Sequence, residues 1–254
     1  MRLSWLVAVA CAASACGRIG FEPPTTDGGG APVISPYARA VLADHPVAYL
    51  RFDEPSGPTV ASLVGNVTGT CDTITFGSAS AVGDGSSVGF DGQASRISLG
   101  DVFPFVGTSH YSFEIWINPA ELGSTRFVID RRTSTAAAEG YSMYLGDTYF
   151  LFARRSNNTE FGYVSVGGPP IHAWMHVVTT YDGAIPSLYI DNVLVADNQG
   201  SGAAPIGSGL GELVIGDKSS GQFFKFSGLL DELAIYDEAL TPSQIATHFH
   251  ASGR

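Results

Sequence analysis

The chain has 254 residues and a formal net charge of −11, from 24 acidic and 13 lysine or arginine side chains. An acidic surface argues against a nucleic-acid partner and against electrostatic adhesion to anionic lipid. Only three cysteines are present, so stability has to come from a packed core and not from a framework of disulfides.

The first residues resemble the signal of a bacterial lipoprotein. Arg2 gives a positive start, the run Leu3–Ala13 is almost wholly apolar, and small residues lead into Cys16 and Gly17. The run is well short of the ~20 residues that a membrane-spanning helix needs. We therefore predict a signal peptide over residues 1–15. The resemblance implies that the thiol of Cys16 is acylated and that Cys16 becomes the first mature residue.

Two alternatives stay open at this end of the chain. One is an ordinary secretory signal cleaved nearby, and the other is acylation of Cys11, which would leave a very short apolar core. Residues 16–36 are rich in Pro, Thr and Gly, which predicts a flexible tether between membrane and domain. Several acyl chains together make a stable membrane anchor. Gly17 lacks the aspartate retention signal of enteric bacteria, so we expect the outer membrane of the cell envelope.

From Tyr37 onward, short runs rich in Val, Ile, Phe, Tyr and Thr alternate with Gly, Asn, Asp and Pro. This pattern is typical of an all-β sandwich or barrel, and residues 37–254 are expected to form one domain. The predicted strands are Ala48–Phe52, Val88–Leu99, Ser109–Asn118, Arg126–Asp130, Tyr141–Leu145, Tyr149–Arg154, Glu160–Val166, Trp174–Thr180, Ser187–Val195, Glu212–Gly216 and Phe224–Tyr236.

Alternation and turn residues refine this prediction. Between Ser109 and Asn118 the residues Tyr111, Phe113, Ile115 and Ile117 share one face, and Ser112, Glu114 and Trp116 share the other. Asp182-Gly183 predicts a hairpin between two of the strands, and Asp191-Asn192 a second tight turn. Thr241, Pro242 and Gln244 form a capping-box pattern, which predicts one short helix from Pro242 to His250.

The order of these segments resembles the bacterial laminin G-like domains of the concanavalin A-like lectin/glucanase superfamily. The resemblance implies an all-β jelly-roll sandwich of two antiparallel sheets with a short C-terminal helix. Members often bind calcium, glycans or proteins, although a shared fold does not fix a function. The segments that carry the resemblance are Val41–Gly57, Gly89–Gly92, Phe113–Ile117, Trp174–Gly183, Leu188–Asn192 and Phe226–Tyr236, followed by Ala239–Thr241.

The resemblance also implies a structural calcium ion. Calcium takes six to eight oxygen ligands, and Asp53, Glu54 and Asp231 are the candidates, because the opening turn and the closing strand lie near each other in the family. The chain departs from the family at Ser62, where an aspartate is usual. The alternative stays open that Asp231 accepts backbone hydrogen bonds and that Asp53-Glu54 forms a plain turn.

Glycanases on this sandwich carry two catalytic carboxylates at alternate positions of one strand, as E-x-D-x-E or E-x-D-x-x-E. The chain contains neither pattern, since Trp116 stands where the aspartate should follow Glu114. More distant acids could converge on a curved face, but arginines lie beside them and should pair with them. These acids are Asp130, Glu139, Asp147 and Glu160, and the arginines are Arg131, Arg132, Arg154 and Arg155. We predict that the protein is not an enzyme.

Histidines and aromatic residues give weaker signals. His172 and His176 are spaced H-x-x-x-H, but on a strand they lie about 13 Å apart, too far to share one metal ion. His248 and His250 end the predicted helix, where a cation suits the helix dipole. Trp116 and Trp174 are expected in the core. Some aromatic residues of the middle strands could line a concave face and stack on sugar rings; these are Tyr141, Tyr144, Tyr149, Phe150, Phe161 and Tyr163.

The function predicted is an envelope-anchored binding module that recognises carbohydrate, or an extracellular or envelope protein, without catalysis. The alternatives are a structural or assembly lipoprotein with no small ligand and, less favoured, a glycoside hydrolase. Exposed aromatic residues flanked by Asn, Asp and Arg would favour the binding module. A face filled by the protein's own loops would favour the structural role.

Overall fold

A computed structural model describes residues 34–123, 125–133, 139–157, 159–197, 205–218 and 224–254. The predicted signal peptide, Cys11, Cys16 and most of the tether lie outside these residues. Within the described ranges, no helix is long and apolar enough to cross a membrane.

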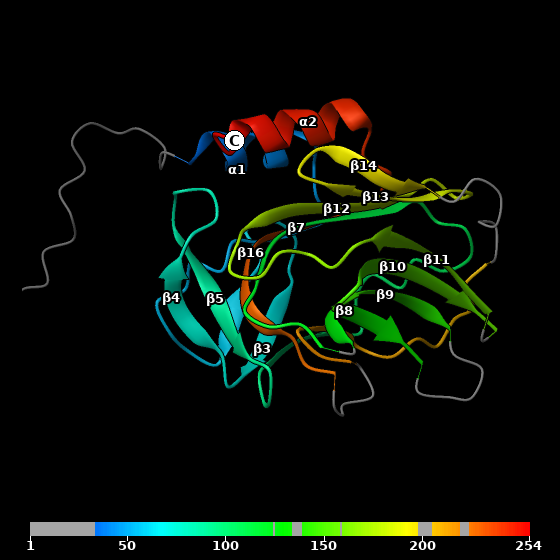
Figure 1. The fold of residues 1–254 in the computed structure, drawn as a ribbon, viewed down its shortest axis with the longest axis horizontal. Helices are drawn as coiled ribbons and strands as arrows, with labels where there is room; N and C mark the ends of the chain where they lie inside the picture. The colour runs from blue at the N-terminus through cyan, green and yellow to red at the C-terminus, as the bar shows by residue number, and fades with distance from the viewer. Residues whose placement is uncertain (1–33, 124, 134–138, 158, 198–204, 219–223) are drawn as a thin grey trace, which may run out of the picture. The chain divides into compact units, whose positions relative to one another are not determined.

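Two eight-stranded antiparallel sheets make up the domain, which confirms the predicted all-β sandwich (Figure 1). Sheet 1 has the strand order β14-β13-β12-β7-β16-β5-β4, and β1 also pairs with β16. Its strands are β1 (Ala48–Leu50), β4 (Thr75–Ala79), β5 (Ser86–Asp91), β7 (Tyr111–Pro119), β12 (Met175–Tyr181), β13 (Pro186–Ile190), β14 (Val193–Asp197) and β16 (Ser227–Tyr236).

Sheet 2 has the order β11-β10-β9-β8-β15-β6-β3-β2. Its strands are β2 (Thr59–Ala61), β3 (Thr68–Asp72), β6 (Arg96–Gly100), β8 (Arg126–Arg132), β9 (Gly140–Gly146), β10 (Tyr149–Ser156), β11 (Thr159–Val166) and β15 (Leu213–Ile215). Strands β8 to β11 follow one another in the chain, whereas β15 pairs with β8 and β6, and β6 with β3, so the middle of the sheet depends on long-range pairing.

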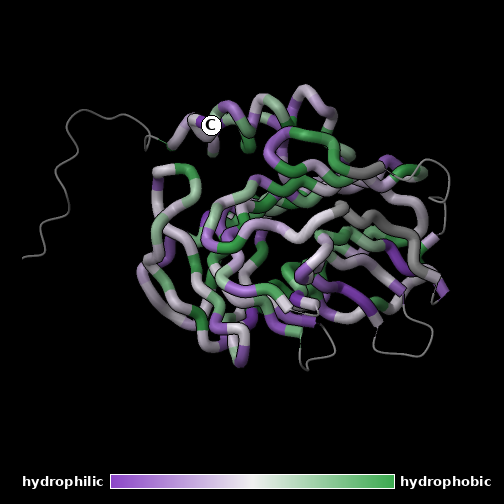
Figure 2. Tube along the Cα trace, viewed as in Figure 1, coloured by the Kyte–Doolittle hydropathy of each residue, from purple (hydrophilic) through white to green (hydrophobic). Residues whose placement is uncertain are grey.

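The main core lies between the two sheets. The predicted alternation of β7 is confirmed, because Tyr111, Phe113, Ile115 and Ile117 all belong to this core and are at most 1% exposed. From sheet 2, Tyr141 packs with its ring centroid 5.2 Å from that of Phe113. In Figure 2 the hydrophobic stretches follow the paired strands.

A second apolar cluster lies on the outer face of sheet 1, beneath two helices (Figure 1). Helix α1 (Pro36–Ala43) contributes Tyr37 and Val41, and α2 (Pro242–Ala251) contributes Ile245; they pack around Trp116. The predicted capping box of α2 is present, with Gln244 Oε1 accepting from the Thr241 amide at 2.8 Å. Trp116 is fully buried as expected, whereas Trp174 is only partly buried.

The structure also differs from the expectations at several elements. Helix α1 was not predicted, although Ser35 caps it and Pro36 stands in its first turn. Strands β2, β3 and β4 were not predicted either, because they are short, largely exposed and contain few large apolar residues. The single strand expected over Val88–Leu99 is two strands, β5 and β6, divided by a turn at Asp91-Gly92. The second tight turn is present, with positive φ at Asp191 and Asn192.

Candidate functional site

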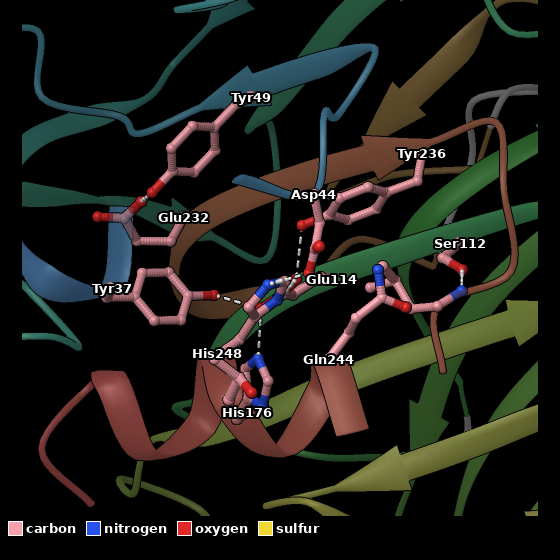
Figure 3. Close-up of polar contacts among 12 residues, drawn as sticks. Tyr37, Asp44, Tyr49, Ser112, Glu114, His176, Glu232, Tyr236, Gln244 and His248 are labelled. Carbon is pink, nitrogen blue, oxygen red and sulfur yellow. Dashed lines mark hydrogen bonds and ion pairs between the residues drawn. The ribbon is translucent and has the colours of Figure 1, made fainter. Parts of the chain in front are cut away.

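The outer face of sheet 1 has two different regions. The first is a buried polar network beneath the helices, formed by Tyr37, Asp44, Glu114, His176, Tyr236 and His248 (Figure 3). Glu114, on β7, lies at its centre. Its carboxylate accepts hydrogen bonds from the two tyrosine hydroxyls at 2.8 Å, and lies 2.8 Å from His176 Nε2 and 2.9 Å from His248 Nδ1.

The charges of this network follow from its contacts. Burial alone would raise the pKa of Glu114, but the imidazole of His248 and the hydrogen bonds from both histidines hold it well below its usual range. Burial alone would lower the pKa of His248, but Glu114 and Asp44 on either side of the ring raise it. His248 therefore donates from both ring nitrogens and carries a charge between two carboxylates.

This set of side chains resembles catalytic machinery, but a substrate has no access to it. The side chains of Glu114, His176 and His248 are 0% exposed. The network instead ties α1 and α2 to the sheet, since its members come from both helices and three strands. His248 lies in the last turn of α2 as predicted, and its ring also contacts the carboxylates of Glu114 and Asp44.

The second region is a hollow of about 370 Å³, lined only by strand and loop residues. Its floor is a row of residues paired across four strands: Thr75, Gly89, Leu229 and Asn118, in that order. Opposed residues of an antiparallel pair point to the same side of the sheet, so these side chains share the outer face. Ser78, Asp91 and His172 lie at the rim of the hollow and add further polar groups to it.

Four polar side chains of the hollow have no partner in the described part of the chain. The hydroxyls of Thr75 and Ser78, the amide of Asn118 and the imidazole of His172 make no hydrogen bond or ion pair to any other described residue. Leu229 is partly exposed between them. Convergent unpaired polar groups around a small apolar floor are typical of a site for a polar ligand.

Two further features shape the hollow. At Gly89 an added Cβ would stand 3.3 Å from Thr75 Cβ and 3.5 Å from Leu229 Cδ2, so the missing side chain deepens the floor. Asp91 Oδ1 accepts three backbone N–H groups at 2.8, 2.8 and 2.9 Å. Slight burial acts the other way, but these bonds hold the pKa of Asp91 well below its usual range. The rim therefore carries a fixed negative charge, which disfavours an anionic ligand.

The structure does not gather the three predicted calcium ligands. Asp53 Oδ2 lies 3.2 Å from Arg51 Nη1, and its Oδ1 accepts the Ser86 amide at 2.7 Å. Glu54 accepts the Ala61 amide at 2.7 Å. Asp231 is fully buried and accepts the Ala81 amide at 2.8 Å.

This arrangement does not fit a calcium ion held by Asp53, Glu54 and Asp231. Asp231 Oδ1 is an orphaned buried acceptor, but burial and the charge of Glu232 raise the pKa of Asp231 to about 8, so it is largely protonated at neutral pH. Asp53 already faces a guanidinium, and Glu54 Oε1 already accepts a backbone amide. Within the described ranges, no group of three or more His, Cys, Asp or Glu side chains could hold a metal ion.

The aromatic residues predicted for a concave face divide into two groups. Tyr141 and Phe150 are fully buried in the core. Tyr144 and Tyr149 face outward on sheet 2, their ring centroids 6.1 Å apart, and Tyr144 lies 4.9 Å from Phe127. The side chains of Phe161 and Tyr163 lie outside the described ones. This outer face of sheet 2 is a second surface on which sugars could stack.

Two of the distant acids considered as catalytic groups, Asp130 and Glu139, have structural partners. Asp130 is fully buried, with Oδ1 2.5 Å from Arg132 Nε, as the expected pairing requires. Arg131 instead pairs with Asp101, at 2.6 Å. Glu139 accepts the amides of Asn157 and Gly207 at 2.8 and 2.7 Å.

The two packed antiparallel sheets define the class of protein as a jelly-roll sandwich. The family model for Laminin G domains of the concanavalin A-like lectin/glucanases superfamily matches residues 91–246, more than half of the chain. The chain therefore belongs to this superfamily. A search of curated proteins found no match.

Solved structures with the same fold are distant in sequence. Domain 4 of AbnA, a GH43 extracellular arabinanase from Geobacillus stearothermophilus solved with arabinotriose, is 20% identical, with a TM-score of 0.62; the match covers 80% of this chain and 97% of that domain. The binding domain of Paraclostridial Mosquitocidal Protein 1 is 16% identical, with a TM-score of 0.60 and coverage of 82% and 52%.

The ligand-binding domain of botulinum neurotoxin serotype D, solved with N-acetylneuraminic acid, is 11% identical, with a TM-score of 0.63 and coverage of 83% and 52%. This chain thus spans about half of each toxin fragment. At these identities the likeness establishes the fold alone.

The sequence pattern did not predict that the residues of the hollow form a site. Thr75 and Ser78 lie on β4, a strand that the pattern did not predict, and Leu229 and Asn118 come from strands far apart in the chain. One signal was available: Gly89 stands inside a predicted strand, where glycine marks a bulge or a close approach by another group.

Proposed function

We propose that this protein is a carbohydrate-binding module without catalytic activity, and that the hollow on sheet 1 holds a neutral sugar unit. The observation that carries the proposal is the set of unpaired polar side chains, Thr75, Ser78, Asn118 and His172, around the apolar floor at Leu229. Hydroxyl, amide and imidazole groups can each donate or accept, so they suit the mixed hydroxyls of a sugar.

The volume and charge of the hollow support this ligand class. About 370 Å³ has room for a single ring with its hydroxyls, and it lies within the usual range of small-molecule sites. Asp91 at the rim and the net charge of −11 disfavour carboxylated sugars. The arabinanase domain solved with arabinotriose gives a neutral-sugar precedent on this fold, whereas the neurotoxin domain was solved with an acidic sugar.

The placement of the acids supports binding without hydrolysis. Glu114 is sealed beneath the helices, and Asp130 is buried against Arg132. Asp91 lies at the hollow but is ionised, so it cannot act as the general acid that glycoside cleavage needs. Polysaccharides incubated with the protein should release no reducing ends, and turnover that is lost on mutating Asp91 would restore the hydrolase alternative.

A glycan array carrying neutral and sialylated oligosaccharides tests the ligand class. The purified full chain should retain neutral glycans, and Asn118→Ala should lose them. Tyr144→Ala is the matched control on the outer face of sheet 2 and should bind as the parent does. Retention of sialylated glycans alone, or loss in Tyr144→Ala but not in Asn118→Ala, would refute this assignment. No retention at all would favour the assembly role.

We also propose that the module is lipid-anchored through Cys16 in a bacterial outer membrane, on the sequence pattern described above. Cys16→Ser should release the protein from membranes, whereas Cys11→Ser should leave it anchored. Intact-mass analysis of the mature N-terminus should find a diacylglyceryl-modified Cys16. A mature chain that begins at another residue would contradict the proposal.

A further inference from the structure

Trp174 lies at the end of the row of residues that forms the floor of the hollow. Next to it in the chain, Met175 pairs with Ile117, and both side chains belong to the main core between the sheets. One step further along this ladder, Trp174 comes opposite Asn118 on the outer face. The Trp174 side chain packs against the apolar cluster of that face, as this position requires. The floor row is therefore Thr75, Gly89, Leu229, Asn118 and Trp174.

The segment that precedes β12 stays beside the end of β7. The His172 amide donates to the Pro119 carbonyl at 2.7 Å, and the His172 side chain lines the hollow. Trp174 does not line it, so this indole lies next to the hollow and not inside it. Neighbouring strands are about 4.8 Å apart, which puts the backbone of Trp174 about 10 Å from that of Leu229. A single sugar ring does not cover that span.

Trp174 is more accessible than Trp116, the other tryptophan of the described residues. Trp116 is 0% exposed beneath the helices, whereas Trp174 is partly exposed. The indole N–H of Trp174 makes no hydrogen bond to any described residue, and it reaches solvent, unlike the buried N–H of Trp116. Trp174 thus offers a flat apolar ring and one unused donor, which together suit the apolar face and the hydroxyls of a sugar.

We infer that Trp174 forms a second subsite, on which a second sugar unit stacks while the first occupies the hollow, so that the ligand is a neutral oligosaccharide and not a free monosaccharide. The inference rests on the proposed function. The hollow has room for one ring, and in the other direction the floor row ends at β4, the edge strand of sheet 1. The bound chain therefore runs across the strands, past Asn118 to Trp174.

Calorimetry with sugars of increasing length tests the inference on the purified full chain. The probes are neutral arabino-, xylo-, cello- and manno-oligosaccharides of one to three units. In a series that binds, two units should bind about five- to tenfold more tightly than one, which is the gain expected from one stacked ring. Trp174→Ala should lose this gain and still bind one unit within about twofold of the parent. Trp174→Phe, which keeps a ring, should retain most of the gain.

Phe249→Ala is the matched control for packing, because Phe249 contacts the same apolar cluster from α2. This variant should have a lower melting midpoint and an unchanged dependence of affinity on length. Tryptophan fluorescence gives a second readout: the change on adding a two-unit sugar should disappear in Trp174→Phe, since Trp116 is sealed. If Trp174→Ala does not fold, Trp174→Leu keeps apolar bulk without a ring and takes its place.

Two results would overturn the inference and leave the hollow as a single-unit site: two units that bind the parent no more tightly than one, or a gain that survives Trp174→Ala. Loss of the gain in Phe249→Ala as well would assign Trp174 to packing alone and would also overturn it. If no series binds the parent at any length, the proposed sugar site fails and the second subsite fails with it. Binding of one unit by the parent therefore separates the two failures.

Discussion

The helix-covered region and the hollow lie on the same face of the same sheet, yet they treat polar groups in opposite ways. Under the helices, both oxygens of Glu114 are fully hydrogen-bonded and sealed from water. In the hollow, the side chains of Thr75, Ser78, Asn118 and His172 bind nothing else in the described part of the chain. Polar residues therefore hold the fold together in one region and stay available to a ligand in the other.

The largest expected effect comes from the covered region. Glu114→Ala removes the acceptor shared by Tyr37, Tyr236, His176 and His248, and it leaves buried donors and a buried charge without partners. The free energy of unfolding should fall by about 3–5 kcal/mol. Circular dichroism melting curves measure the loss. Asn118→Ala, in the hollow, is the control and should stay within about 0.5 kcal/mol of the parent. If Glu114→Ala and Asn118→Ala lost the same free energy of unfolding, the distinction between the two regions would be wrong.

The buried groups His248, Asp231 and Glu232 should also make the stability of the protein depend on pH. The folded-state pKa is raised for His248, to about 8 for Asp231 and to about 7 for Glu232. The contribution of His248 is complete below its unfolded pKa of about 6.5 and is lost as the pH rises through the folded value. For the two acids, the cost of ionisation grows from about pH 4 up to their folded values.

All three groups therefore make the protein less stable as the pH rises from about 5 to 9. Glu114 has a lowered pKa and acts in the opposite direction, because its contribution is lost only in strong acid. The melting midpoint should fall by several degrees between pH 5 and pH 9, and Asp231→Asn should flatten part of that slope. A midpoint that rises over this range would show that these groups are not held as described.

The hollow should respond in binding and not in stability. Asn118→Ala should weaken the affinity for a neutral glycan found on the array by about tenfold, the equivalent of one lost hydrogen bond. Isothermal titration calorimetry measures the change. An unchanged affinity with a reduced melting midpoint would assign Asn118 to the fold.

The smallest change to the hollow is Gly89→Ala. The added Cβ would lie 3.3 Å from Thr75 Cβ, so the floor rises by one methyl group. Affinity should fall by a few-fold, while stability should hold, because glycine is a poor strand residue. Calorimetry and a melting curve on the same sample separate the two effects. A large loss of stability would mean that the neighbouring side chains cannot move aside.

The sequence allowed much of the fold to be predicted because several signals are local. Alternation in β7, the Asp191-Asn192 turn and the capping box at Thr241 each lie within a few residues, and all three are confirmed. Helix α1 escaped because it is only eight residues long and follows a stretch without a clear pattern. Ser35 and Pro36 are local signals of a helix start, but the eight residues that follow are too few to show a clear apolar period.

The two polar regions could not be predicted in the same way. Asn118 and Gly89 line the same hollow only because β16 lies between β7 and β5. This arrangement is long-range, and no pattern within a few residues of either position indicates it. Similarly, Glu114 and His248 are 134 residues apart, and only the docking of α2 on the sheet joins them. At the opening turn, Asp53 and Asp231 were named, but Arg51, which neutralises Asp53, was not.

The most direct test of the central claim is to map the bound sugar by nuclear magnetic resonance. Amide shifts of the full chain would be followed while a neutral oligosaccharide retained on the array is added. The account predicts that the largest changes lie at Gly89, Asn118 and Leu229, with Glu114 and its helices unaffected. Changes concentrated at Tyr144 and Leu151, on the outer face of sheet 2, would contradict it.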